Sequence, residues 1–88
     1  MKHYVVFLEM KSEELSAQYR AEHLTYLEEL AAAGKLFSYG RFTDGWGGMV
    51  IYYGESMEEV EALVKQDPFI IHDARTYLIR EWAATECK

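Results

Sequence analysis

A long stretch without glycine or proline, Glu13–Ala33, most constrains how this chain can fold. Ser12 before the stretch and Gly34 after it are residues typical of the two ends of a helix. His23 lies near the middle of the apolar side, where a hydrocarbon side chain would be expected. The apolar residues that define this side recur at helical spacing: Leu15, Tyr19, Tyr26, Leu27 and Leu30. The stretch predicts a helix that carries an imidazole toward the core.

An imidazole in that position needs a polar partner. A buried ring nitrogen without a hydrogen bond costs about 1–3 kcal/mol. The best candidate partner is Asp67, which is predicted to lie where a second helix meets the last strand. Two helices packed side by side on a sheet would bring His23 and Asp67 within hydrogen-bonding range.

The rest of the chain alternates between strand and helix patterns. A second helix is predicted to begin after Ser56, which has the spacing of a capping box with Glu59. It should stop near Gln66, because Pro68 disfavours helical backbone at Asp67. Runs of β-branched and aromatic residues predict strands at His3–Glu9, Lys35–Phe42, Trp46–Tyr53 and His72–Trp82. The order is that of an α+β, ferredoxin-like βαββαβ fold, a four-stranded antiparallel sheet with two helices on one face.

Size and composition favour self-association. The 88 residues indicate one domain over residues 1–88, of which half are hydrophobic and 15% aromatic. Two helices cover only one face of the sheet, and apolar residues occur on both faces of the predicted strands. We therefore expect a homodimer through the open sheet face, with a monomer as the alternative.

Charge, cysteine content and the lack of known motifs exclude several classes of partner and cofactor. The net charge is −6 and the chain has no basic stripe, so a nucleic-acid partner is not expected. Cys87 is the lone cysteine, which fits a reducing, cytoplasmic setting. The first residues run directly into a predicted strand, so neither an export signal nor a membrane span is expected. The three histidines are scattered and no nucleotide-binding glycine pattern occurs, so neither a metal nor a cofactor is expected.

His23 and Asp67 together suit proton transfer. A carboxylate on one ring nitrogen fixes the tautomer and stabilises the charged ring, which leaves the other nitrogen free as a general acid or base. The same pair can equally be a buried polar contact that joins a helix to a loop. Spacing alone does not separate these two interpretations.

Glycine and aromatic residues elsewhere in the sequence are candidates for the walls of a pocket. Gly45-Trp46-Gly47-Gly48 follows the Asp44-Gly45 signal of a tight hairpin and leads into a strand, which favours a turn over an anion cradle. Its glycines would still leave space beside the sheet for a small ligand. Polar residues without a site role are expected at the start of the last strand: His72, Asp73 and Arg75. The candidate pocket walls are aromatic: Tyr39, Trp46 and Phe69.

Several short motifs together resemble the YciI-like (YCII-related) family. They span nearly the whole chain, and the most specific are the helix-borne histidine and the Asp-Pro-Phe triplet. In chain order they are His23-Leu24, Tyr26-Leu27, Gly34-Lys35-Leu36, Tyr39-Gly40-Arg41-Phe42, Asp44, Gly48 and Asp67-Pro68-Phe69.

The resemblance implies a dimeric α+β barrel with a His–Asp centre, carried here by His23 and Asp67. Asp44 falls in a segment that the family uses near its cleft. At least one branch of the family removes chloride from a chlorinated hydroxyquinol. Arg41-Phe42-Thr43 replaces a proline-containing segment of other members, a departure that bears on substrate identity.

Two hypotheses about function remain open. The first is a small cofactor-independent enzyme that performs isomerisation or elimination on a small compound, with an aromatic compound as one candidate. His23 would be the acid or base and Asp67 its orienting partner. The second is a noncatalytic dimeric ligand-binding or accessory protein in which the pair is structural. A cleft that reaches His23 would favour the first.

Overall fold

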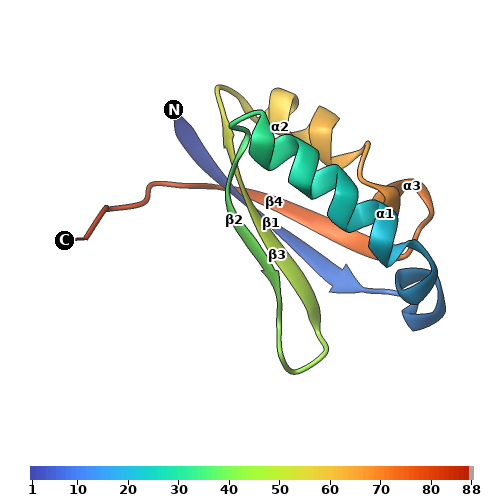
Figure 1. Cartoon of the computed structure of the whole chain (residues 1–88). Helices are drawn as coiled ribbons and strands as arrows, with labels where there is room; N and C mark the ends of the chain where they lie inside the picture. The colour runs from blue at the N-terminus through green and yellow to red at the C-terminus, as the bar shows by residue number, and fades with distance from the viewer. Residues whose placement is uncertain (88) are drawn as a thin grey trace.

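The computed structural model describes residues 1–87, and Lys88, the last residue of the expected domain, lies outside the described residues. Within the described part, strands and helices alternate along the chain (Figure 1). Their bounds are β1 (Lys2–Met10), α1 (Glu13–Ala32), β2 (Leu36–Arg41), β3 (Gly47–Gly54), α2 (Met57–Val64), α3 (Pro68–Ile71) and β4 (Arg75–Trp82).

The strands form a four-stranded antiparallel sheet in the order β2-β3-β1-β4, and all the helices lie on one of its faces (Figure 1). This confirms the predicted ferredoxin-like α+β fold. Tyr4 pairs with Tyr52 and Val6 with Val50, and all four side chains are buried beneath the helices. Side chains alternate between faces along a strand, so the intervening residues of β1 point to the open face.

The ends of α1 and α2 follow the predicted capping signals. Ser12 Oγ accepts a hydrogen bond from the Leu15 amide at 3.1 Å, and Gly34 follows α1 with φ of 76°. Ser56 Oγ accepts from the Glu59 amide at 3.2 Å at the start of α2. These local contacts fix where both helices begin.

The segment after α2 differs from the prediction. Asp67 does not lead directly into the last strand but caps the short helix α3, because its carboxylate accepts from the Phe69 amide at 2.9 Å and Pro68 suits a first helical position. The last strand begins at Arg75 rather than His72, because Asp73 has a φ of 60° and turns the chain into β4. His72 instead stacks on Tyr19 of α1, with ring centroids 3.7 Å apart.

The β2–β3 hairpin reaches beyond the helices, so its tip is not covered by them (Figure 1). Gly47, at the start of β3, has a φ of 141°, and a Cβ there would overlap the carbonyl oxygen of Leu8. Only glycine fits where β1 and β3 approach this closely.

The sheet face opposite the helices is partly apolar. The T-shaped contact between Phe7 and Trp46 lies over it, and its large exposed side chains include Phe37, Leu78 and Trp82. Within residues 1–87 no helix is both long and apolar enough to span a membrane.

Candidate functional site

The predicted contact between His23 and Asp67 is present. His23 Nδ1 of α1 lies 2.8 Å from Asp67 Oδ1, and both side chains are buried. An ionised carboxylate can only accept, so Nδ1 carries the hydrogen of this bond. Within residues 1–87, Nε2 makes no hydrogen bond, yet it is not among the fully enclosed unpaired atoms. Nε2 is therefore the ring nitrogen that a bound molecule can reach.

Asp67 is the more deeply buried partner, with 1% of its surface exposed. Its Oδ1 accepts from both the His23 ring and the Phe69 amide. Its Oδ2 is buried without a hydrogen-bond partner among the described residues. The hydrogen bonds to this carboxylate are thus made through one oxygen. They connect the imidazole of α1 to the start of α3.

The field of Asp67 reaches two tyrosines of the core. Burial and then the negative charge of Asp67 raise the pKa of Tyr26 to about 12, and the same two causes raise the pKa of Tyr52 further. Tyr26 Oη donates to the Leu63 carbonyl at 2.7 Å, which joins α1 to α2. Both phenols therefore remain neutral beside the His–Asp pair at ordinary pH.

Phe69 packs against the imidazole of the His–Asp pair. Its ring stacks on the His23 imidazole with centroids 3.9 Å apart and planes inclined by 10°. The guanidinium carbon of Arg75 lies 4.4 Å from the centroid of the same ring. This buried side chain therefore positions both an imidazole and a cation.

A hollow of about 180 Å³ opens beside this cluster, between α1 and the β2–β3 hairpin. Side chains from both helices and strands line it, among them Arg20, His23, Tyr39, Arg41, Phe69 and Arg75. The structure thus brings His23, Tyr39 and Phe69 together at one cavity, with Asp67 behind His23. Of the glycines expected to leave space beside the sheet, Gly48 lines this hollow and Gly47 does not; Gly40 lines it as well.

The structure places Asp44 and Trp46 elsewhere. Both line a separate hollow of about 500 Å³ with Phe7, Phe42 and Leu78 on the open side of the sheet. Asp44 Oδ1 accepts from the Trp46 amide at 2.9 Å, a contact that shapes the hairpin turn. These two residues do not share a cavity with His23 in this structure.

The sequence interpretation missed three arginines at the His23 hollow: Arg20, Arg41 and Arg75. Arg20 lies one helical turn before His23 on the same side of α1, a spacing that was readable from the sequence. Arg75 was expected to be polar without a role, but it donates to Ser16 Oγ at 2.9 Å and to the Leu8 carbonyl at 3.3 Å. Burial and then the charge of Arg20 lower the pKa of Arg75.

No group of three or more His, Cys, Asp or Glu side chains that could hold a metal ion occurs among residues 1–87. The polar groups that face the His23 hollow are instead an imidazole, a phenol and guanidinium groups. Such groups suit an organic molecule with acceptor oxygens rather than a metal ion.

The model of the YCII-related domain family matches residues 1–83, which include every strand, every helix and the His–Asp pair. The chain belongs to the YCII-related family. One relative with a similar sequence is the uncharacterized protein YjpA of Bacillus subtilis (strain 168). It is 29% identical over 77 residues, which cover 88% of this chain and 91% of the relative.

Solved structures show that this YCII-related chain shares its fold with proteins of low sequence identity. One is 5-chloro-2-hydroxyhydroquinone dehydrochlorinase (TftG) from Burkholderia phenoliruptrix AC1100, in complex with 2,5-dihydroxybenzoquinone. It has a TM-score of 0.80 and 24% identity, and the match covers 94% of this chain and 95% of that one. At3g17210 from Arabidopsis thaliana has a TM-score of 0.60 and 14% identity, with coverage of 100% and 99%.

Proposed function

We propose that this YCII-related protein is a small cofactor-independent enzyme that moves a proton on a small molecule, by isomerisation or elimination. One observation carries the proposal. His23 Nδ1 is bonded to the buried Asp67 carboxylate, while Nε2 remains unbonded beside a hollow. An oriented imidazole with one free nitrogen is the usual arrangement of a general base.

In the proposed reaction, Nε2 of His23 removes a proton from the substrate, and the electrons of the broken bond form a new double bond. Asp67 stabilises the resulting imidazolium and does not itself take the proton. In an isomerisation the ring returns the proton to a different substrate atom. In an elimination the electron pair expels a leaving group, and the proton leaves to solvent.

The size of the hollow supports a single-ring substrate. Its volume of about 180 Å³ is close to that of a cavity that holds benzene, about 150 Å³. The fold neighbour TftG is named a dehydrochlorinase, and its complex contains a benzoquinone. Both facts favour a small aromatic compound as the first substrate class to examine.

One observation favours the alternative of a noncatalytic ligand-binding protein. Asp67 Oδ1 also accepts from the Phe69 amide, so the carboxylate has a structural role whether or not His23 is a base. In that case the pair would only join α1 to α3, and the hollow would bind a ligand without changing it.

Replacement of His23 separates these functions. Proton transfer can be followed by NMR in D₂O as deuterium uptake by hydroxylated ring compounds, and chloride release can be followed from 5-chloro-2-hydroxyhydroquinone. His23→Gln should lower either rate at least about 100-fold and keep the fold. His72→Gln, which removes an imidazole stacked on Tyr19 outside the hollow, should keep the wild-type rate. Turnover that survives His23→Gln, together with a large loss of stability, would make the pair structural.

We propose that the active form is a homodimer through the open sheet face. The half-exposed side chains of Leu78 and Trp82 support this, because apolar residues on an uncovered sheet are stabilised by a second surface. A face-to-face pair of sheets would also cover the hollow at Trp46.

We place the protein in the cytoplasm. Cys87 is exposed and is the lone cysteine of the sequence, which fits a compartment where thiols stay reduced. Fractionation of cells that express the chain with a small tag would test this, and recovery outside the cytosolic fraction would contradict it.

A further inference from the structure

The lining of the His23 hollow has an unusual charge. The chain carries a net charge of −6 and only four arginines, Arg20, Arg41, Arg75 and Arg80. Three of the four line this hollow, and no aspartate or glutamate is among its lining residues. Positive charge is therefore concentrated at the candidate site of an acidic protein.

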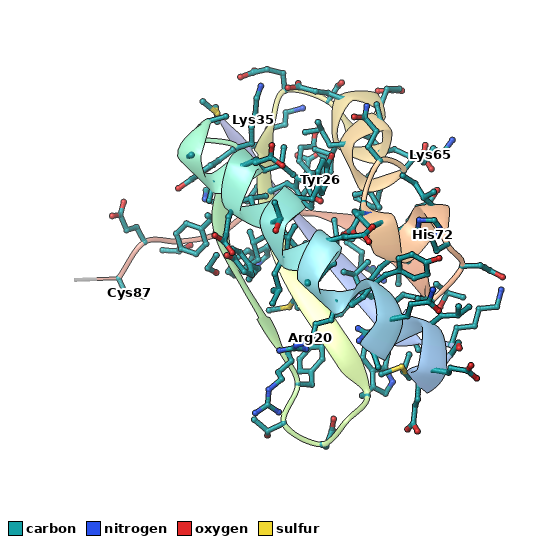
Figure 2. The ribbon with its side chains drawn as sticks, turned by 45° about the vertical axis from the view of Figure 1, so that its right-hand side comes forward. Arg20, Tyr26, Lys35, Lys65, His72 and Cys87 are labelled. Carbon is teal, nitrogen blue, oxygen red and sulfur yellow. The ribbon has the colours of Figure 1, made fainter. Side chains whose placement is uncertain are left out.

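These arginines come from separate parts of the fold. Arg20 is on α1, Arg41 ends β2, and Arg75 begins β4. Figure 2 shows Arg20 on the side of α1 that faces the hairpin of β2 and β3. Because β2 and β4 are the two edges of the sheet, the charges converge from different directions on one space.

Internal ion pairs do not account for these charges. Among residues 1–87 the pairs between basic and acidic side chains within 4.0 Å are Lys11 with Asp73 and His23 with Asp67. Arg20 and Arg41 are exposed and make no side-chain hydrogen bond within that part of the chain. Their guanidinium groups remain free to bind a ligand.

Arg75 has a fixed position. Its bonds to Ser16 Oγ and the Leu8 carbonyl hold it against the Phe69 ring. Burial and the nearby charge of Arg20 lower its pKa. Two cations kept this close repel each other, and an anion between them would relieve that repulsion.

We infer that the His23 hollow selects an anion: a small ring compound that bears a carboxylate or another planar oxyanion, held by Arg20, Arg41 and Arg75 against the imidazole. Guanidinium groups match planar oxyanions through paired hydrogen bonds. This inference rests on the proposed function for the identity of the site, and it names the class of substrate. An anion bound there would place its ring beside Nε2 of His23.

Binding of benzoate and of benzamide tests the inference without any turnover. The two probes have nearly the same shape and differ in charge. Isothermal titration calorimetry on the chain of 88 residues should give benzoate a Kd at least about tenfold lower than that of benzamide. Equal affinity for the two probes would overturn the inference while leaving proton transfer by His23 untouched.

Matched variants locate the charge effect. Arg20→Gln and Arg41→Gln should each weaken benzoate about tenfold and change benzamide less than about twofold. Both residues are exposed and unbonded, so the variants should fold. Arg80→Gln is the control, because Arg80 lies on the open face of the sheet and lines a different hollow. Loss of benzoate affinity in Arg80→Gln, with none in Arg20→Gln and Arg41→Gln, would place the anion elsewhere.

Glycine amide signals report where the probe binds. Gly40 and Gly48 line the His23 hollow, whereas Gly34 and Gly54 line another. Benzoate should shift the ¹⁵N–¹H signals of the first pair and leave those of the second pair in place. The reverse pattern would contradict the proposed site even if benzoate binds tightly.

Discussion

The imidazole of His23 lies flat against the phenyl ring of Phe69, with centroids 3.9 Å apart and planes inclined by 10°. Phe69 is 2% exposed, so its position is set by the core rather than by solvent. The guanidinium of Arg75 lies over the same ring at 4.4 Å. One buried aromatic side chain thus aligns the candidate base and one of the cations beside it.

Phe69→Leu tests this alignment. Leucine keeps the site apolar but removes the flat surface, so unfolding free energy should fall by about 1–3 kcal/mol while the ring of His23 loses its orientation. The rate of turnover should fall by more than the loss of folded protein explains. Ile71→Leu, on the exposed side of the same short helix, is the control and should change neither quantity. Full activity in Phe69→Leu would show that stacking is not needed.

The acceptor oxygen and the charge of Asp67 should have separate effects, the first on stability and the second on turnover. Asp67→Ala removes the cap of α3 and the partner of His23, which should cost about 2–4 kcal/mol of unfolding free energy. Asp67→Asn keeps an acceptor oxygen, so it should cost clearly less stability but still reduce turnover. Urea unfolding of both variants compares them, and equal losses would contradict the capping role of Oδ1.

The raised pKa of Tyr26 predicts that the free energy of unfolding falls at alkaline pH. Its folded-state pKa is raised from 10.0 to about 12, so the unfolded chain releases this proton first and stability falls as pH rises through that range. Tyr26→Phe should lower stability at neutral pH by about 0.5–1.5 kcal/mol, through the lost bond to Leu63.

The same variant should also show a shallower decline in stability above about pH 9. Tyr52, whose pKa is likewise raised, supplies the slope that remains. Urea midpoints measured at several pH values test both effects. Parallel pH profiles for Tyr26→Phe and the wild type would refute the assignment.

Gly47 should tolerate no side chain. Gly47→Ala places a methyl group against the Leu8 carbonyl at a positive φ, which should cost more than about 2 kcal/mol. Gly40→Ala is the matched comparison, because a Cβ there meets no atom within 4 Å. Thermal unfolding should separate the two variants clearly, and similar melting temperatures would contradict the close strand approach.

Leu78 tests the proposed dimer. Leu78→Asp introduces a charge on the open sheet face and should convert the dimer to a monomer in light scattering after size-exclusion chromatography. Ile71→Asp is a fair control, since Ile71 is exposed to a similar extent, 59% against 54%, but lies on the helix side. A wild-type protein that is already monomeric would rule out the dimer directly.

Local signals predicted most of the fold. Ser12, Gly34 and Ser56 mark helix ends through hydrogen bonds and backbone conformations within a few residues, so their effect is readable from the sequence. The predicted end of the second helix near Gln66 is correct, since α2 ends at Val64, but the short helix α3 that follows was not predicted. That helix depends on Asp67 as its cap and on Pro68 at a first helical position, where a residue that ends one helix can begin another.

The site was predicted only in part. His23 stood out because an imidazole on an apolar helix face demands a partner, and Asp67 is that partner in the structure. The convergence of Arg41 and Arg75 depends on the sheet order, which brings together residues far apart in the chain. Trp46 lies with Phe7 on the other side of the sheet, a consequence of the hairpin geometry that periodicity does not reveal.

The bonds of Arg75 also bear on how the site can change during evolution. Arg75 joins the Leu8 carbonyl, Ser16 and the Phe69 ring, so its replacement would disturb the fold together with the ligand. Arg20 and Arg41 carry no such structural duty within the described chain. If the hollow binds the anion proposed above, substitution of Arg20 or Arg41 would change which compounds bind while the scaffold stays intact, whereas substitution of Arg75 would change both.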